Sequence, residues 1–124
     1  MSELDNASLT NQPKLSIIIP IQNEKNNLEA LFRGIRSVLT PLKCSYEVLF
    51  IDDGSDDGSD KVLEKLHYLY PRDICVITLR HRSGKADALG AAISMARGKW
   101  ILTMDGDGQD NPSEIPKFLR KMDV

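Results

Sequence analysis

The sequence has few of the features that define nucleic-acid-binding or membrane-spanning proteins. Only 6% of its 124 residues are aromatic, and its formal net charge is -2. This balance gives no electrostatic reason to expect nucleic acid or an anionic membrane as the main partner. No hydrophobic run is long enough to cross a bilayer, and the N-terminus has no signal-peptide pattern. We therefore expect a cytoplasmic domain, which in a longer protein could work at the cytoplasmic face of a membrane.

Cysteine is also scarce. Cys44 and Cys75 are the only two, and they lie in or near apolar stretches without the spacing of metal ligands. We expect reduced, buried thiols.

The composition indicates one folded domain, because 41% of the residues are hydrophobic and 27% are charged. Residues 1–13 are polar and aperiodic, which predicts a flexible leader. Residues 14–124 then alternate regularly between two kinds of segment. Short runs rich in β-branched residues predict strands over 15–20, 46–51, 74–79 and 100–104.

The segments between these runs have apolar residues at helical spacing. Asn26 is placed to cap the first helix with Glu29 as its partner, and Pro41 is placed to end it. Gly98 is expected to stop the third helix, and Pro112 or Ser113 to start the last.

Strands that alternate with helices predict an α/β fold, a Rossmann-like parallel sheet with helices on both faces. We expect the strand order 3-2-1-4. Ligands of such sheets bind beyond the carboxyl ends of the strands, where the order reverses.

Acidic residues gather in the segments that follow three of the predicted strands. Gln22 to Glu24 come after the first strand, Asp52 and Asp53 after the second, and Asp105 to Asp110 after the fourth. Like charges at close range repel, so this clustering favours a bound cation or a ligand rich in hydroxyl and amide groups. Capping of helices by acids is an equally good explanation for 56–60.

Asp105, Gly106 and Asp107 form an Asp-x-Asp pair on a glycine-bearing loop. Two such carboxylates can hold Mg²⁺ or Mn²⁺ and leave coordination positions open for phosphate oxygens. The metal would bridge the protein and a diphosphate that carboxylates otherwise repel, and would stabilise a leaving diphosphate.

Four segments, in order and spacing, resemble the motifs of family 2 glycosyltransferases, which have the GT-A fold. They read SIIIPIQNE, VLFIDDGSDDGS, SGKADALGAAISMARGKW and TMDGDGQDNPSEIPKF. The likeness runs from about Leu15 to Phe118 and is greatest to the branch that uses polyprenyl-phosphate acceptors, such as dolichol-phosphate mannosyltransferases and undecaprenyl-phosphate sugar transferases.

The resemblance implies a nucleotide-sugar donor and a single inverting displacement at the anomeric carbon. It implies that Pro20, Gln22 and Glu24 line the base and ribose pocket, and that Asp53 bonds the nucleobase while Asp52 shapes the turn. It also implies roles at the diphosphate for a second set of residues: Lys85, Asp105, Gly106, Asp107 and Gln109, with Asp105 and Asp107 as the metal ligands.

Two positions depart from the family pattern, since Gln22 stands where an aromatic residue is common and Gly108 where leucine is common. The family's general base and acceptor-binding segments lie downstream, so the catalytic base is expected beyond Val124. We expect 14–124 to be the donor-binding part, to bind nucleotide without transferring sugar, and to self-associate through apolar surface that the missing part would cover.

Other kinds of protein share some of these features. Asp53, Ser55, Asp57, Gly58 and Glu64 fit the spacing of an EF-hand calcium loop, but the segment before them is typical of a strand. A phosphoacceptor receiver domain would carry its acid pair after the first strand, and a dinucleotide-binding fold would need glycines there. A noncatalytic nucleotide-binding domain fits every motif and remains an alternative.

Overall fold

The computed structural model describes residues 12–79, 85–106 and 110–122, without the side chain of Lys85. Its strands form a four-stranded parallel sheet in the order β3-β2-β1-β4. Their bounds are β1 (Leu15–Ile21), β2 (Tyr46–Asp53), β3 (Ile74–Leu79) and β4 (Trp100–Thr103). The predicted α/β class and strand order are confirmed.

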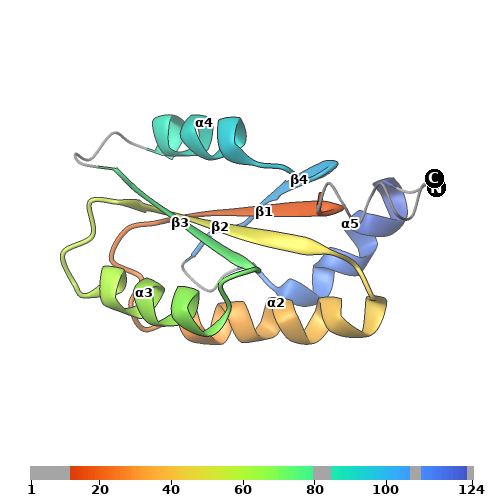
Figure 1. Cartoon of the computed structure of the whole chain (residues 1–124), viewed down its shortest axis with the longest axis horizontal. Coiled ribbons are helices and arrows are strands. Elements are labelled where there is room, and N and C mark those ends of the chain that lie inside the picture. The colour runs from red at the N-terminus through yellow and green to blue at the C-terminus, as the bar shows by residue number, and fades with distance from the viewer. Residues whose placement is uncertain (1–11, 80–84, 107–109, 123–124) are drawn as a thin grey trace.

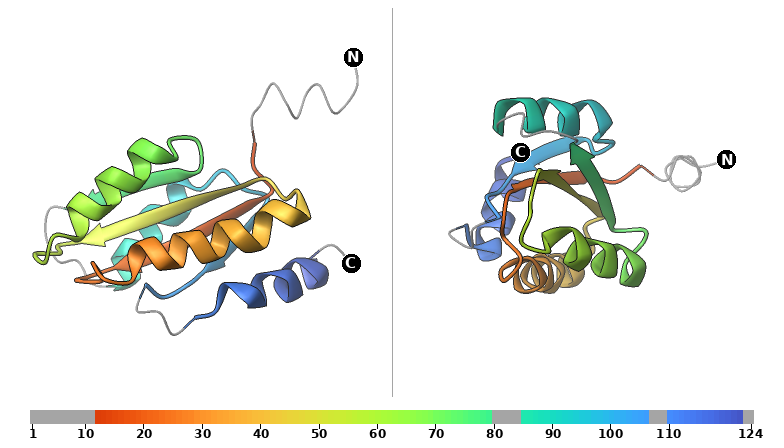
Figure 2. Two further views of the ribbon diagram at one scale, coloured as in Figure 1. Left: turned by 90° about the horizontal axis from the view of Figure 1, so that it is seen from below. Right: turned by 90° about the vertical axis from the view of Figure 1, so that its left-hand side faces the viewer.

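Helices cover both faces of the sheet (Figures 1 and 2). One face carries α2 (Leu28–Leu42), α3 (Ser59–Leu69), the 3-10 turn η1 (Pro112–Glu114) and α5 (Ile115–Met122). The other carries α4 (Lys85–Met95), which packs over β1 and β2.

Burial on both faces explains why the strands read as continuous apolar runs. In β1, Ile17 and Ile19 are fully buried on the side of α2, and Ile18 is fully buried against Ala88 and Ala92 of α4. The small side chains of α4 allow this helix to approach the sheet closely.

The ends of the helices differ from the prediction. Asn27, not Asn26, precedes the first turn of α2. It makes no side-chain cap, and its amide nitrogen donates to Glu24 Oε2 at 3.0 Å. Glu29 pairs instead with Arg33, at 2.6 Å. Pro41 does not end α2 directly: it lies inside the last turn, and the helix continues for one more residue, to Leu42.

Gly98 does not stop α4, which ends three residues earlier, at Met95. Its function is close packing at the amino end of the sheet. The Gly98 N–H donates to Ser16 Oγ at 2.8 Å, and the Ser16 hydroxyl donates to the buried carboxylate of Glu47 at 2.6 Å. The backbone N–H of Arg97 also donates to Glu47, at 2.7 Å.

Both cysteines are free, as expected, but they are half-buried rather than buried. Burial raises the pKa of the Cys75 thiol, so Cys75 stays a neutral thiol at physiological pH.

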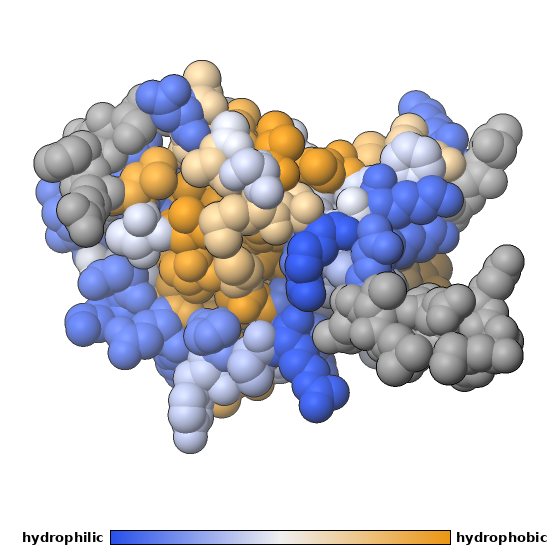
Figure 3. All heavy atoms as spheres, turned by 45° about the horizontal axis from the view of Figure 1, so that its top comes forward, coloured by the Kyte–Doolittle hydropathy of each residue, from blue (hydrophilic) through white to orange (hydrophobic). Residues whose placement is uncertain are grey.

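The face that carries α4 leaves part of β4 uncovered. Ile93 and Met95 of α4 and Ile101 of β4 are 51%, 52% and 40% exposed. Figure 3 turns this face toward the viewer and shows a broad hydrophobic area. Self-association through this surface stays a prediction.

Replacing Gly98 with alanine should destabilise the fold. A Cβ there would lie 2.5 Å from Ser16 Oγ and 2.6 Å from the Ser16 backbone nitrogen, so the backbone must move. We expect the free energy of unfolding, measured in urea, to fall by about 1–3 kcal/mol. Gly90→Ala is the matched control, because its Cβ would meet nothing within 4 Å. It should stabilise the α4 helix by about 0.5–1 kcal/mol; equal effects of both changes would contradict the packing role of Gly98.

Candidate nucleotide-sugar site

The loops that follow β1, β2 and β4 meet at the carboxyl edge of the sheet, on the left in Figure 1. Parallel strands in register bring their carboxyl ends to one edge, and Pro20 and Ile21 of β1 pair with Ile51 and Asp52 of β2.

Asn23 joins the first two loops. Its backbone is left-handed, with φ of 57°, a conformation that asparagine adopts more readily than most residues. Its N–H donates to Ser55 Oγ at 2.9 Å, and its Oδ1 accepts from the Asp56 N–H at 2.8 Å.

A second set of bonds continues the same connection. The Glu24 N–H donates to Ser59 Oγ at 3.1 Å, and the Lys25 N–H donates to Asp57 Oδ2 at 3.1 Å. Asp57 Oδ1 accepts from both the N–H and the hydroxyl of Ser59, at 2.9 and 2.6 Å. The hydrogen bond from the Ser59 hydroxyl lowers the pKa of Asp57.

These contacts also exclude an EF-hand calcium loop in this segment. The segment before Asp53 is β2, not a helix, and Asp57 is engaged by the backbone of the neighbouring loop. The acidic segment therefore serves to join two loops.

The acid pair lies at the end of β2, and both residues are buried, with Asp52 3% and Asp53 7% exposed. Asp52 Oδ1 accepts from the Ser55 N–H at 3.0 Å, which is the contact of a residue that shapes the turn. Gln22 Nε2 donates to the backbone oxygen of Asp53 at 3.2 Å. Gln22 and Asp53, predicted to share a pocket, thus lie side by side.

In the loop after β4, the side chain of Asp110 bonds the backbone of Asp105. The N–H of the half-buried Asp105 donates to Asp110 Oδ2 at 2.7 Å. Asp110 is turned back toward Asp105 and does not cap the last helix; Asn111 Oδ1 accepts from the Ser113 N–H at 3.0 Å in its place.

Gly106 is buried against β1. A Cβ at this position would lie 2.7 Å from Ile21 Cγ2 and 3.4 Å from the Pro20 carbonyl oxygen. Only glycine lets the loop after β4 approach the end of β1 this closely.

A cavity of about 160 Å³ opens between these loops. It brings Pro20 next to Asp105 and Asp110. It also includes Leu89, Thr103 and Met104, which the sequence analysis missed. Thr103 and Met104 could have been found from their position directly before Asp105, whereas the helical pattern of Leu89 indicated only a core residue.

The structure does not describe every residue of the predicted site. Asp107 and Gln109 are outside the described residues, and Lys85 is seen only as the first residue of α4. Across 12–79, 85–106 and 110–122, no group of three or more His, Cys, Asp or Glu could hold a metal ion. The carboxylate of Asp105 has the hard oxygen chemistry that Mg²⁺ and Mn²⁺ prefer.

Comparison with known proteins defines the class. Residues 16–124 match the model of glycosyl transferase family 2. The architecture is similar to that of GT-A glycosyltransferases, α/β proteins that bind nucleotide sugars. The chain belongs to glycosyl transferase family 2 and is a glycosyltransferase domain.

Two relatives share most of the chain. An uncharacterized glycosyltransferase of Synechocystis sp. is 42% identical over 110 residues, which cover 87% of this chain and 34% of the relative. The undecaprenyl-phosphate 4-deoxy-4-formamido-L-arabinose transferase of Klebsiella pneumoniae is 34% identical over 110 residues, covering 89% of this chain and 34% of the relative. The chain thus spans about a third of the length of these relatives.

Solved structures of similar fold contain donor ligands. A mannosyltransferase from Pyrobaculum calidifontis in complex with GDP-Man and Mn²⁺ superposes with a TM-score of 0.69 and 27% identity, covering 77% of this chain and 28% of the other. TarS of S. aureus in complex with UDP-GlcNAc superposes with a TM-score of 0.71 and 27% identity, covering 87% of this chain and 30% of the other.

Asp57, which joins the loops after β1 and β2, should make the free energy of unfolding depend on pH in the acid range. Because the folded-state pKa of Asp57 is lowered, its contribution is present above the unfolded pKa and is lost as pH falls through the folded value. Asp57→Asn should therefore flatten the fall in unfolding free energy below about pH 4, measured by urea titration at several pH values. Asp60→Asn removes a neighbouring exposed charge and should leave the slope unchanged; a slope that depends equally on both residues would rule out this role of Asp57.

Proposed function

We propose that the carboxyl edge of the sheet binds the nucleoside diphosphate of a sugar donor with Mg²⁺ or Mn²⁺, for inverting transfer of the sugar to a polyprenyl phosphate. The strongest support is the close approach of the loop after β4 to the end of β1: Gly106 lies against Ile21, and Asp105 lines a cavity with Pro20. β2 ends at the same edge, at Asp53. Ligands of parallel α/β sheets bind in this position.

The end of β1 and β2 suits the nucleoside. Asp53 supplies acceptor atoms for the N–H groups of a base, and Glu24 supplies them for ribose hydroxyls. Gln22 is bonded to the Asp53 backbone, so its amide is held rather than free to stack on the base. Because the loops are already bonded to each other, little conformational freedom remains to be lost when the nucleoside binds.

The loop after β4 suits the diphosphate. A diphosphate beside Asp105 and Asp107 would be repelled, so binding needs a cation that both carboxylates hold. When bound, Mg²⁺ or Mn²⁺ supplies Lewis-acid stabilisation of the negative charge on the departing diphosphate. Asp110 holds the Asp105 backbone in place, and Gly106 lets it approach β1. Lys85 and Gln109 are proposed as further diphosphate contacts.

The relatives suggest the acceptor. The Klebsiella pneumoniae relative is named for an undecaprenyl-phosphate acceptor, and we extend a polyprenyl phosphate to this protein on that basis. Among the described residues, no helix is both long enough and apolar enough to cross a membrane. Transfer of a sugar to a lipid acceptor would take place at the cytoplasmic face of a membrane. We assign the catalytic base to none of these 124 residues.

Metal-assisted binding is the test. Titration calorimetry of the chain with GDP and with UDP should show binding that Mn²⁺ or Mg²⁺ strengthens by about tenfold or more, since one charge-assisted contact contributes about 1.5–3 kcal/mol. Asp105→Asn and Asp107→Asn should each remove the effect of the metal.

Asp56→Asn is the matched control, because it removes one acid from the same edge. The Asp56 side chain is exposed, and the residue bonds Asn23 through its backbone N–H, which the change keeps. The control should keep the metal effect. Binding that is independent of metal in the unaltered chain, or equal loss in all three variants, would overturn the proposed role of the Asp-x-Asp pair.

A further inference from the structure

A second cavity lies at the opposite, amino edge of the sheet. Its volume is about 1050 Å³. The residues around it precede or begin strands or lie in the second half of α2, so it is separate from the carboxyl edge. Its lining includes Arg36, Lys43, Tyr46, Arg72, Asp73 and Arg97.

The charge of this cavity is opposite to that of the whole chain. Four of its lining residues are cations and one, Asp73, is an acid, whereas the chain as a whole carries a formal charge of -2. No carboxylate of the described residues lies within ion-pair distance of Arg36, Lys43 or Arg72. Unneutralised cations around one concave space attract anions more strongly than the same cations spread over a surface.

Two of the four cations, Arg36 and Arg97, are held in place by contacts of their side chains with the fold. The Arg36 guanidinium lies over the ring of Tyr70, 5.1 Å from its centroid. Arg97 is anchored to the buried carboxylate of Glu47 through its backbone N–H and through Nε, at 2.7 and 3.2 Å, which leaves its terminal nitrogens for another partner. Lys43 has a fixed left-handed backbone, with φ of 51°, at the end of α2.

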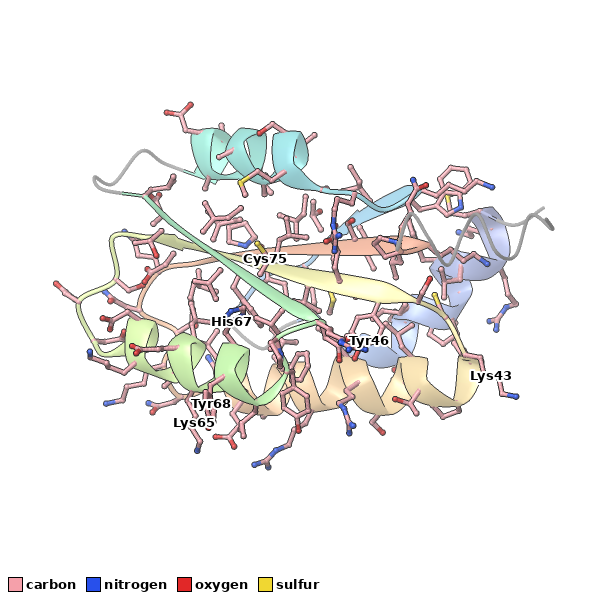
Figure 4. The ribbon with its side chains drawn as sticks, viewed as in Figure 1. Lys43, Tyr46, Lys65, His67, Tyr68 and Cys75 are labelled. Carbon is pink, nitrogen blue, oxygen red and sulfur yellow. The ribbon has the colours of Figure 1, made fainter. Side chains whose placement is uncertain are left out.

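A neutral donor accompanies the cations. Burial, followed by the charge of Asp73, raises the pKa of Tyr46 to about 12, so its phenol keeps its proton at physiological pH. Tyr46 is the first residue of β2, and Lys43 follows the end of α2 three residues earlier; Figure 4 labels both. A protonated phenol beside guanidinium groups is a donor set for phosphate oxygens.

Helix dipoles offer a simpler explanation, because Lys43, Arg72 and Arg97 each follow the carboxyl end of a helix. Such cations are stabilised there without any ligand. That explanation does not require the cations to converge on one cavity, and it predicts no saturable binding of anions.

We propose that the amino-edge cavity is a binding site for a phosphate group carried by a second ligand, distinct from the sugar donor. The shared chemistry is a phosphate with two or more negative charges, whether in a free phosphorylated molecule or in an anionic lipid head group.

The test uses the full chain in EDTA, which suppresses metal-assisted binding at the carboxyl edge. Inorganic pyrophosphate is titrated calorimetrically in one arm. Phosphatidylcholine vesicles with and without phosphatidic acid are co-sedimented with the protein in the other. Saturable binding in the first arm identifies a free phosphate as the ligand source, and binding only to phosphatidic acid vesicles identifies a lipid head group.

Lys43→Gln combined with Arg72→Gln should weaken the observed binding by about tenfold or more, the effect of losing charge-assisted hydrogen bonds. The control combines Lys61→Gln with Lys65→Gln, which removes the same charge from the exposed surface of α3, where Figure 4 labels Lys65. This control and Asp105→Asn should leave binding unchanged. No binding in either arm, or an equal loss in the control pair or in Asp105→Asn, would overturn the proposal.

Discussion

Hydrogen bonds between the loop after β1 and the loop after β2 hold together the two halves of the pocket that we propose for the nucleoside. Asn23 bonds both Ser55 and Asp56, and Asp57 bonds Lys25. The parallel register of β1 and β2 brings these loops to one edge, but the register alone does not fix their conformation. The serine, asparagine and aspartate side chains do this, because they replace water as partners for backbone groups that have left the sheet. The positions of Gln22, Glu24 and Asp53 depend on this connection.

The fold was predictable from the sequence because its two central strands, β1 and β2, are buried on both faces. Runs such as LSIIIP and YEVLFI have no polar alternation, and alternation of such runs with amphipathic helices specifies a parallel sheet. The ends of the helices were less predictable. Asn27 bonds Glu24 and Asp110 bonds Asp105, so both side chains are used in contacts within their own loops and not as caps. Helix propensity does not reveal which partner such a side chain takes.

The site was predictable in outline only. The acids after β2 and β4 could be assigned to one edge because parallel strands end together. The sequence contains no signal for Leu89, which reaches the cavity beside Pro20 and Asp105 from α4. It also could not distinguish acids that bind a ligand from acids that hold loops. The structure assigns Asp57 to the second group through its bonds to Ser59 and Lys25.

The two edges of the sheet differ in charge. The carboxyl edge carries Glu24, Asp53 and Asp105, and the amino edge carries Arg36, Lys43 and Arg72. The buried Glu47 lies at the amino edge, where Ser16 and Arg97 satisfy its carboxylate. This separation means that a metal-bound diphosphate and a bare phosphate should favour opposite ends of the same small domain.

The donor diphosphate and its metal are proposed to bind at the carboxyl edge. Paramagnetic broadening of backbone amide signals by Mn²⁺ in the presence of GDP or UDP tests this directly, because the broadening reports distance from the metal. We expect selective loss of the signals of Ile21, Asp105 and Gly106, while those of Tyr46 and Val48 stay sharp. Selective broadening of Tyr46 and Val48, or uniform broadening of all these residues, would contradict this proposal.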